Sequence, residues 1–333
     1  MSKVGIIANP ASGKDIRRLV AYASLMDNRD KADLVRRIIL GVASTGVSEI
    51  VAMPDYYGLV SQAAAGLGRD GPACRVTMLE MPVTGTQEDS TRAMALLEAL
   101  GVGCVVTVGG DGTNRAVAKA NGTVPLVPVS TGTNNVFPLM VEATTAGIAA
   151  GVVAQEVVAR QEVVAVQKRI VLTQDGRECD MALVDAVTLE QPFVGARAVW
   201  RLEEVRQVIC TRATPESIGL SAIGGSICPV DADEDAGLYL ELGEGGGRVR
   251  AAVLPGVIQE VAIRHCRRLA LGEEVEVTIS PCLVAMDGER ELRVERVAAA
   301  RFRVERSGPP VVDVRRAIRA ASEVGFFQTG TQE

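Results

Sequence analysis

A glycine-rich loop with a single carboxylate follows a strongly apolar segment, residues 104–108, in the first half of the chain. The loop reads Gly109-Gly110-Asp111-Gly112-Thr113. Glycines can adopt positive φ angles and let the backbone approach a ligand without a Cβ clash, and successive amides then form an anion-binding nest. A helix that begins near Thr113 would add free N–H groups and the positive end of its dipole. These features predict a phosphate-binding loop.

Asp111 is the unusual member of this loop, because a carboxylate repels a phosphate unless it has a separate task. One such task is to orient an acceptor hydroxyl and take its proton, and another is to bind Mg²⁺. The alternative is a plain strand-to-helix turn in which Asp111 acts as a cap, since Gly-Gly and Asp-Gly are common turn dipeptides. The loop alone leaves these interpretations open.

Two further polar loops are expected beside the first one. The apolar segment 125–129 runs into residues 130–135, and the first apolar segment of the chain runs into residues 9–14. Ligands bind at the carboxyl ends of strands in an open parallel sheet, so three such loops converge on one edge. Lys14 does not complete a Walker A pattern, whose spacing is absent. It is either a phosphate ligand or a solvated surface lysine.

The segments between these loops predict a parallel sheet covered by helices on both faces. The apolar runs are continuous, as in strands buried on both sides, and they alternate with segments of helical spacing. The predicted strands are residues 4–8, 49–53, 75–81, 104–108 and 125–129, and the predicted helices are residues 31–42, 87–100 and 114–119. The fold class is therefore α/β, with a Rossmann-like N-terminal domain.

The pattern changes after a transition near residues 151–168. Short segments follow, several of them strictly alternating, which is typical of half-exposed antiparallel strands. The predicted strands are residues 169–173, 181–189, 238–242, 248–253, 274–279, 283–286, 291–294 and 300–304, with helices over 193–208 and 312–324. We expect a nucleotide-binding domain over 1–160, a mostly β substrate-binding domain over 161–306, and a C-terminal helix within 307–333 that returns to the first domain.

Composition excludes several classes of function. Aromatic residues make up 3% of the chain and the net charge is −6, which argues against nucleic-acid partners and a membrane surface. There is no signal peptide and no apolar stretch of membrane-spanning length, so we expect a cytoplasmic protein. The seven cysteines form no CxxC pair and are expected to be reduced. A single histidine, His265, leaves no catalytic triad and no multi-histidine metal site.

The three loops resemble motifs of a known superfamily. Residues 109–113 resemble the GGDGT signature of NAD kinases and of diacylglycerol and sphingosine kinases. Residues 9–13 resemble the first motif of the lipid-kinase branch, and residues 131–135 resemble the following glycine-rich motif. Over nearly its full length, including residues 85–89 and 194–198, the chain resembles the acetoin-catabolism X proteins, which are grouped as ATP-NAD kinase-like.

The resemblance implies an active site between the two domains. Asp111 would be the general base for ATP-dependent, Mg²⁺-assisted phosphoryl transfer to the 2′-hydroxyl of the adenosine ribose of NAD(H), yielding NADP(H). It implies small nucleotides as partners and a homo-oligomer assembled through the second domain. The implied nucleotide contacts are Asn9, Gly109, Gly110, Gly112, Thr113, Asn114, Thr131, Thr133, Asn134, Asn135, Asp185, Ser221 and Ala222.

Two departures concern the acceptor side of that site. Val184 stands where NAD kinases carry Asn, and Ile223 stands where they carry Tyr, so polar contacts to the acceptor are lost. Another hydroxylated small molecule, linked to acetoin metabolism, or a nucleotide sensor without turnover therefore remain alternatives. A lipid acceptor is disfavoured because no amphipathic basic helix is evident. Residues 287–289 resemble the DGE element of lipid kinases or form a hairpin turn.

Overall fold

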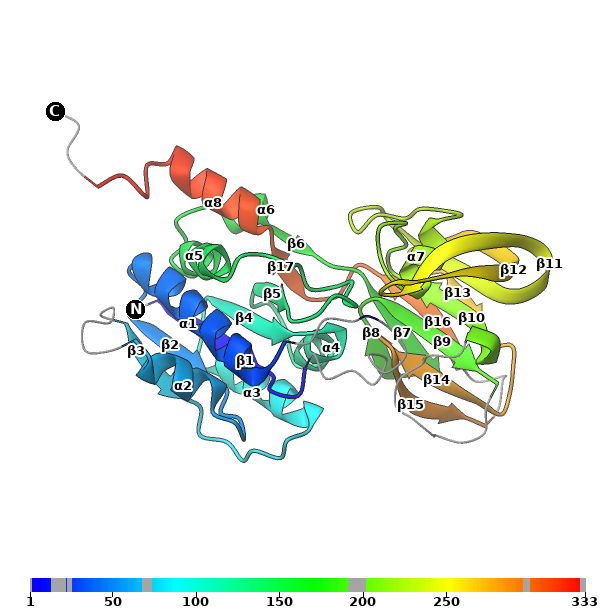
Figure 1. Ribbon diagram of the computed structural model, residues 1–333, viewed down its shortest axis with the longest axis horizontal. Coiled ribbons are helices and arrows are strands. Elements are labelled where there is room, and N and C mark those ends of the chain that lie inside the picture. Colours follow the sequence, from blue (N-terminus) through cyan, green and yellow to red (C-terminus); the bar gives the residue numbers. More distant parts are fainter. Residues whose placement is uncertain are drawn as a thin grey trace.

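The computed structural model describes residues 2–12, 22, 26–67, 74–190, 202–295 and 300–329. Within these ranges the chain forms one seven-stranded, one six-stranded and one four-stranded sheet. Figure 1 shows the seven-stranded sheet with its helices on one side of the molecule and the other two sheets on the opposite side, with α4 lying beside β7 and β8.

The seven-stranded sheet has the strand order β3-β2-β1-β4-β5-β17-β6. Its strands are parallel except for β6, which is antiparallel to β17. The strands are β1 (Lys3–Ala8), β2 (Glu49–Ala52), β3 (Arg75–Met78), β4 (Cys104–Gly109), β5 (Leu126–Ser130), β6 (Val164–Val166) and β17 (Pro310–Val312). The central strands β1, β4 and β5 are almost entirely buried, as their continuous apolar runs predict. The α/β fold class with a parallel N-terminal sheet is therefore confirmed.

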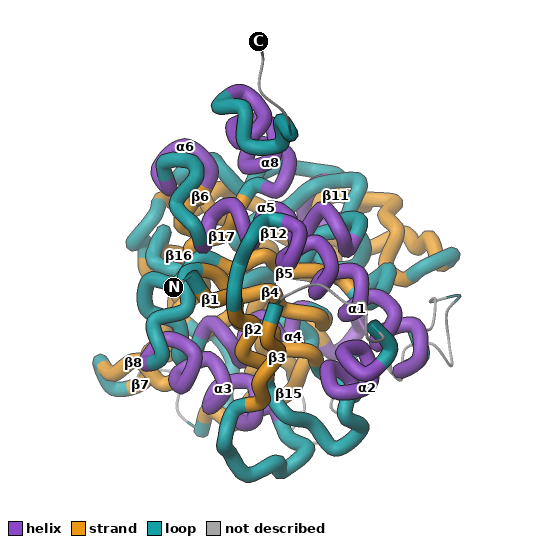
Figure 2. Tube along the Cα trace, turned by 90° about the vertical axis from the view of Figure 1, so that its left-hand side faces the viewer, coloured by secondary structure: helices purple, strands orange, loops and turns teal. Residues whose placement is uncertain are grey.

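Helices cover both faces of this sheet (Figure 2). One hydrophobic cluster joins one face of the strands to α1, α2, α5 and α8, and a second cluster joins the other face to α3 and α4. The helices are α1 (Asn28–Ser44), α2 (Leu59–Ala65), α3 (Gln87–Ala99), α4 (Asp111–Ala118), α5 (Ala143–Ala154), α6 (Arg160–Val163) and α8 (Val314–Glu323). The expected helices over 31–42, 87–100 and 114–119 correspond to α1, α3 and α4, whereas α2 and α5 were not foreseen.

The second half of the chain packs the other two sheets face to face. Their shared core contains Ile170 and Phe302 from the four-stranded sheet and Ile209 and Val284 from the six-stranded sheet. Helix α7 (Leu220–Gly225) covers the opposite face of the six-stranded sheet. In order across the sheets, the strands are β12 (Val257–Ala270), β11 (Ala236–Leu254), β10 (Val205–Cys210), β9 (Asp185–Leu189), β14 (Cys282–Met286) and β15 (Glu289–Val294), then β13 (Glu274–Glu276), β16 (Ala300–Glu305), β7 (Arg169–Gln174) and β8 (Arg177–Ala182).

Three sequence expectations for this half need correction. The helix expected over 193–208 is wrong for its described part, where Leu202–Glu204 is a short 3₁₀ turn and β10 follows; residues 193–201 lie outside the described residues. Val205 and Val208 are spaced as on one face of a helix, but both are buried in the sheet, and this burial favours the strand. The strand expected over 181–189 is interrupted after Ala182, and the segments 238–242 and 248–253 are parts of the single strand β11.

The end of the chain returns to the first sheet. β17 lies between β5 and β6, and α8 follows it with Val314, Ala317 and Ala321 buried in the same cluster as α1 and α5. None of the helices in the described ranges is long and apolar enough to cross a bilayer. All seven cysteines lie in described ranges, and none forms a disulfide.

Candidate functional site

The loops after β1, β4 and β5 meet at one edge of the sheet, as predicted. The Nδ2 of Asn9 donates to Oγ1 of Thr113 at 2.9 Å, which joins the first loop to the glycine-rich loop. The hydroxyl of Thr131 donates to Oγ of Ser12 at 3.1 Å, which joins the third loop to the first. Gly13 and Lys14 lie outside the described residues.

Two glycines of the central loop are required by close packing. A Cβ on Gly109 would lie 2.5 Å from Oγ1 of Thr113, and a Cβ on Gly110 would lie 2.7 Å from Oδ1 of Asn135. Neither glycine has a positive φ angle, so the expected need for that conformation is not the reason for these residues. Gly109 leaves room for Thr113 of its own loop, and Gly110 leaves room for Asn135 of the loop after β5.

Helix α4 begins at Asp111, two residues earlier than expected. The amide of Asn114 donates to the carbonyl of Gly110, so the preceding amides of Asp111, Gly112 and Thr113 have no acceptor within the helix. The side chain of Asn114 does not reach the surface. It is fully buried, accepts from the hydroxyl of Thr107 at 2.6 Å and donates to the carbonyl of Gly110.

The carboxylate of Asp111 contacts the third loop. Its Oδ1 accepts from the amide of Phe137 at 2.8 Å and from the amide of Val136 at 3.1 Å, and Oδ2 also accepts from Val136. The side chain is half-buried. Asp111 is thus held in a fixed position by the backbone that follows β5.

The third loop contains one polar atom that lacks a partner. Asn135 donates from Nδ2 to Oγ of Ser130 at 2.8 Å and shapes the loop internally, while Thr133 is exposed. The Oδ1 of Asn134 is buried, and no hydrogen-bond partner for it exists among the described residues. Buried polar atoms without partners are uncommon and require an explanation. A ligand that donates to Asn134 is such an explanation.

Lys31 positions the first loop, a role that the sequence reading missed. Its side chain is fully buried, and Nζ donates to the carbonyls of Asn9, Pro10 and Ser12 and to Oδ1 of Asn28. The signal in the sequence is a lysine at the start of an otherwise apolar helical face, where a charged side chain must find partners.

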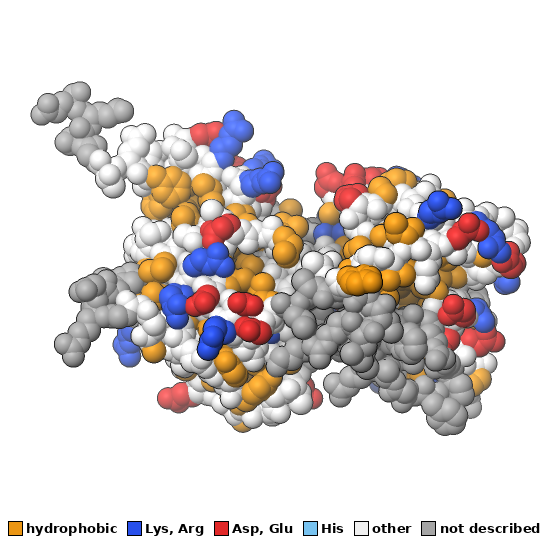
Figure 3. Space-filling view, in the orientation of Figure 1, with side chains coloured by type: hydrophobic (Ala, Val, Ile, Leu, Met, Phe, Trp, Pro, Cys, Tyr) orange, Lys and Arg blue, Asp and Glu red, His pale blue; other side chains and the backbone are white. Residues whose placement is uncertain are grey.

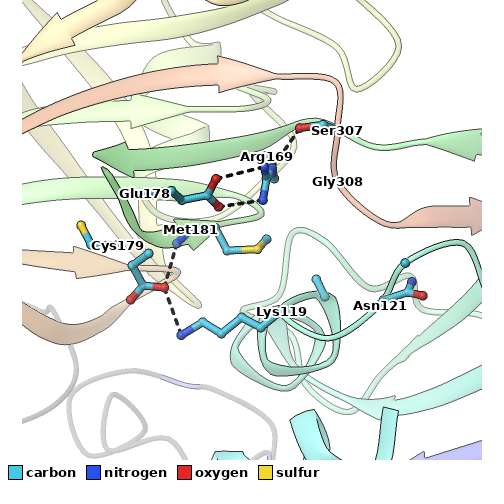
Figure 4. Close-up of a pocket in the computed structure, with 11 residues that line it drawn as sticks. Lys119, Asn121, Arg169, Glu178, Cys179, Met181, Ser307 and Gly308 are labelled. Carbon is cyan, nitrogen blue, oxygen red and sulfur yellow. Dashed lines mark hydrogen bonds and ion pairs between the residues drawn. The ribbon is translucent and has the colours of Figure 1, made fainter. Parts of the chain in front are cut away.

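A buried ion pair connects α4 to the second half of the chain. Arg115 donates from Nη2 to Oδ2 of Asp180 at 2.6 Å and from Nε to the carbonyl of Met181 at 2.6 Å. Lys119 lies 3.0 Å from the other oxygen of Asp180, a contact drawn in Figure 4. Burial on its own would raise the pKa of Asp180, but the charges of Arg115 and Lys119 and the Met181 amide hold that pKa below its usual value.

A second buried carboxylate lies in the turn between β14 and β15. Asp287 and Gly288 have φ angles of 49° and 81°, so the hairpin-turn interpretation describes their backbone. The Asp287 carboxylate accepts from the amides of Leu183, Val184 and Asp185 at 2.9, 2.7 and 3.2 Å. Burial raises the pKa of Asp287 to about 7; Arg115 opposes this shift and the nearby charge of Asp111 adds to it.

With this geometry established, comparison with known proteins identifies the family. Residues 4–157 match the family model described as the ATP-NAD kinase N-terminal domain, and residues 168–307 match the acetoin catabolism protein X C-terminal domain. Acetoin catabolism protein X from Cupriavidus necator is 40% identical over 300 residues, which cover 87% of this chain and 84% of that protein. The chain belongs to the acetoin catabolism protein X family.

The resemblance drawn from the loop motifs is thereby confirmed, and the N-terminal match supports a kinase-type phosphotransferase. Among solved structures, a putative diacylglycerol kinase from Bacillus anthracis aligns over 93% of this chain and 96% of that chain, with 15% identity and a TM-score of 0.39. That similarity is too low to carry an argument about the site.

The predicted nucleotide contacts in the second domain differ in their exposure to solvent. Asp185 begins β9, half-buried, with its amide on Asp287. Ser221 and Ala222 are fully buried in α7, and the Ser221 hydroxyl donates to the carbonyl of Arg212 at 3.1 Å. The side chains of Ser221 and Ala222 are therefore inside the domain, and their predicted contact with a nucleotide has no accessible surface in this structure.

Arg212, which the sequence reading did not single out, enters the same region from the second domain. Its guanidinium carbon lies 5.5 Å from the centre of the Phe137 ring, whose amide binds Asp111. Nη2 donates to Oε1 of Gln167 at 3.0 Å. Burial lowers the pKa of Arg212, and the charges of Asp111 and Asp287 act in the opposite direction.

Two cavities lie along α4 away from the loops. One of about 470 Å³ lies between the C-terminal end of α4 and β8, with Lys119, Asn121, Glu178 and Cys179 on its walls (Figure 4). The other, of about 540 Å³, lies between α3 and α4. Neither is lined by a predicted site residue. On the face seen in Figure 3, acidic and basic side chains of the first domain are interspersed.

Proposed function

We propose that this chain is an ATP-dependent phosphotransferase that binds nucleotide phosphates at the loops after β1, β4 and β5. The observation that carries the proposal is the hydrogen-bonded convergence of these loops at the start of α4. The first helical amides there lack helical acceptors, and such amides, together with the helix dipole, bind anions. The partnerless Oδ1 of Asn134 lies in the third of these loops.

Asp111 acts as the general base on the acceptor hydroxyl. Its carboxylate is fixed by the amides of Val136 and Phe137, which supports a positioned rather than a mobile base. Mg²⁺ is usually bound by one or two carboxylates together with substrate phosphates. Asp111 would offer a carboxylate to such an ion, which neutralises charge on the phosphates when bound. The described residues contain no protein-only metal cluster.

The first acceptor to consider is the 2′-hydroxyl of the adenosine ribose of NAD(H). The motif resemblance supports this choice, because it implies that Asp185, at the start of β9, hydrogen-bonds a ribose. Val184 and Ile223 weaken it, because both are buried in apolar clusters. The second acceptor is another small hydroxylated molecule linked to acetoin catabolism, which the name of the 40% identical relative favours.

A lipid acceptor has little support. Helix α8 is amphipathic and exposes Arg315, Arg316 and Arg319, which corrects the expectation that the chain contains no such helix. Its apolar side, however, is buried against the first domain, so it has no apolar face to insert into a membrane surface. A nucleotide sensor without turnover remains the candidate from a different class.

The test is transfer from γ-labelled ATP to a panel of acceptor alcohols that includes NAD and NADH, with wild-type protein, Asp111→Asn and the exposed control Asp175→Asn. Loss of a general base lowers the rate by about 10²-fold or more, so only Asp111→Asn should lose turnover. Turnover that Asp111→Asn retains would overturn the assignment. NAD binding without turnover favours the sensor, and Asp111-dependent ATP consumption that ignores NAD favours another acceptor.

The assembly of the chain is a separate proposal. NAD kinases, which the motifs resemble, imply a homo-oligomer formed through the second domain. Sedimentation-velocity centrifugation of the whole chain distinguishes a dimer or tetramer from a monomer, and a monomer at all concentrations would reject this proposal.

A further inference from the structure

Arg212 differs from Arg115, the fully buried arginine near the candidate site, because its side chain is only half-buried. Arg115 has its guanidinium occupied by Asp180 and the carbonyl of Met181. Among the described residues, the guanidinium of Arg212 donates one hydrogen bond, from Nη2 to Gln167, and its buried Nε has no partner there. The described residues also offer Arg212 no ion pair within 4.0 Å. A buried Nε–H group without an acceptor is costly unless a ligand anion accepts its hydrogen bond.

We propose that Arg212 binds an oxygen of a ligand phosphate group, so that the second domain completes the phosphate site formed by the three loops. Arg212 follows β10, packs over the ring of Phe137, and thereby lies beside the loop whose amides hold Asp111. Its guanidinium is also close enough to Asp111, the first residue of α4, for that carboxylate to influence it. The inference rests on the proposed function for the identity of the ligand.

The neighbouring carboxylates do not take the place of that ligand. Asp111 and Asp287 influence Arg212 electrostatically, but both carboxylates already accept backbone amides, Asp111 from Phe137 after β5 and Asp287 from Val184 before β9. Arg212 thus brings a positive charge into a region that holds two carboxylates, which offsets their repulsion of a phosphate. Arginine suits this task because its N–H groups are directed donors and it remains charged when buried.

The phosphate in question belongs either to the donor or to the acceptor. On the donor, Arg212 would stabilise the charge that spreads over the transferred oxygens. On the acceptor, it would select a phosphorylated substrate such as a dinucleotide. Both sources present the same chemistry to the guanidinium, so binding measurements with different probes must separate them.

The experiment is titration calorimetry with inorganic pyrophosphate, ADP and NAD on wild-type protein and on Arg212→Met, Arg212→Lys and Arg206→Met. Arg206 is the matched control, because it lies on β10, the strand that precedes Arg212, and is partly exposed and paired with Glu190. A hydrogen bond to a charged group corresponds to roughly 10- to 100-fold in affinity. We expect that loss for Arg212→Met, a smaller loss for Arg212→Lys, and less than about twofold change for the control.

Repeating the titrations in an Asp111→Asn background separates this inference from the proposed catalysis. Equal probe binding by wild type and Arg212→Met, or no binding by wild type, would overturn the role of Arg212. Arg212-dependent binding without ATP turnover would support this role and reject the phosphotransferase. Loss confined to pyrophosphate and ADP assigns the donor, and loss confined to NAD assigns the acceptor.

The unfolding temperature distinguishes binding from a structural role. Because Arg212→Met removes a buried N–H without a partner, we expect its unfolding midpoint to equal or exceed that of wild type. A lowered midpoint with unchanged affinity in the folded protein contradicts the proposal. Should Arg212→Met fail to fold, Arg212→Lys carries the test, since it keeps the charge but lacks the Nε donor.

Discussion

Arg115 and Asp180 form a buried ion pair, 2.6 Å between Nη2 and Oδ2, that joins the helix beginning at Asp111 to strand β8. The same helix carries the candidate phosphate loop at one end and Lys119, the second partner of Asp180, at the other. The buried Arg115–Asp180 ion pair therefore fixes the position of the glycine-rich loop relative to the second domain. This ion pair is the first target for mutation.

Arg115→Met should destabilise the protein strongly. Removing one partner of a buried pair leaves an uncompensated charge and typically costs about 3–5 kcal/mol, although Lys119 will offset part of this. Urea unfolding gives the free energy of unfolding. Arg36→Met is the control, because Arg36 pairs with the exposed Asp33 and should change stability by about 1 kcal/mol or less. Equal losses in the two variants would contradict the interpretation.

The ionisation of Asp287 should make stability depend on pH. Its pKa rises from an ordinary value of 3.8 to about 7 in the folded protein, so between these values the native state binds a proton that the unfolded state has lost. This contribution is fully present below pH 3.8 and is lost as pH rises through 7, with a slope of at most about 1.4 kcal/mol per pH unit.

Asp287→Asn should remove that slope, because the amide does not titrate and Asn tolerates a positive φ. Asp175→Asn is the matched control: Asp175 also precedes a glycine in a hairpin turn, with a φ of 51°, but it is exposed. Unfolding free energies measured from pH 4 to 8 decide the matter. A slope that survives in Asp287→Asn, or disappears in Asp175→Asn, would assign it to another group.

Lys31→Met should release the first loop. The carbonyls of Asn9, Pro10 and Ser12 would lose a charged donor, and one such hydrogen bond corresponds to about 1.5–3 kcal/mol. We expect a lower unfolding midpoint together with roughly tenfold weaker ADP binding in the folded protein. Lys3→Met, which removes a partly exposed pair with Glu49, should leave both measurements nearly unchanged. Unaltered ADP affinity in Lys31→Met would show that the first loop does not contact the nucleotide.

Gly110→Ala should affect binding more than stability. The added Cβ would lie 2.7 Å from Oδ1 of Asn135 and must displace that side chain. We expect a loss of ADP affinity of about tenfold, equivalent to roughly 1.4 kcal/mol. Gly247→Ala adds a Cβ where no atom lies within 4 Å, and calorimetry should find its affinity equal to wild type. Matching affinities in both variants would remove the third loop from the site.

The sequence predicted the first sheet well because its strands are buried on both faces. Continuous apolar runs such as those of β4 and β5 leave little choice of structure. Helix α5 escaped notice because it is apolar all around its circumference: it packs between α1, the sheet and α8 and shows no amphipathic period. The long strand β12 was missed because it is rich in exposed charged residues.

Only those parts of the candidate site that consist of residues adjacent in the sequence could be predicted. The three loops follow from strand ends, which local patterns locate. The side-chain partners of Arg115, Arg212 and Asp287 lie at least 45 residues away in the chain, the smallest separation being that between Arg212 and Gln167. Spacing along the sequence carries no information about such pairings. The burial of a charged side chain at a contact between the domains can be established only from the folded structure.

The position of β17 has a consequence for dissecting this protein. Because β17 lies between β5 and β6, the polypeptide enters the nucleotide-binding half, leaves it, and comes back to finish its sheet. A fragment that stops at residue 157, where the kinase-type match ends, would lack two strands and the α8 covering layer. Separate expression of that half requires splicing residues beyond 305 onto its end, and a simple truncation is expected to aggregate through the uncovered edge of β5.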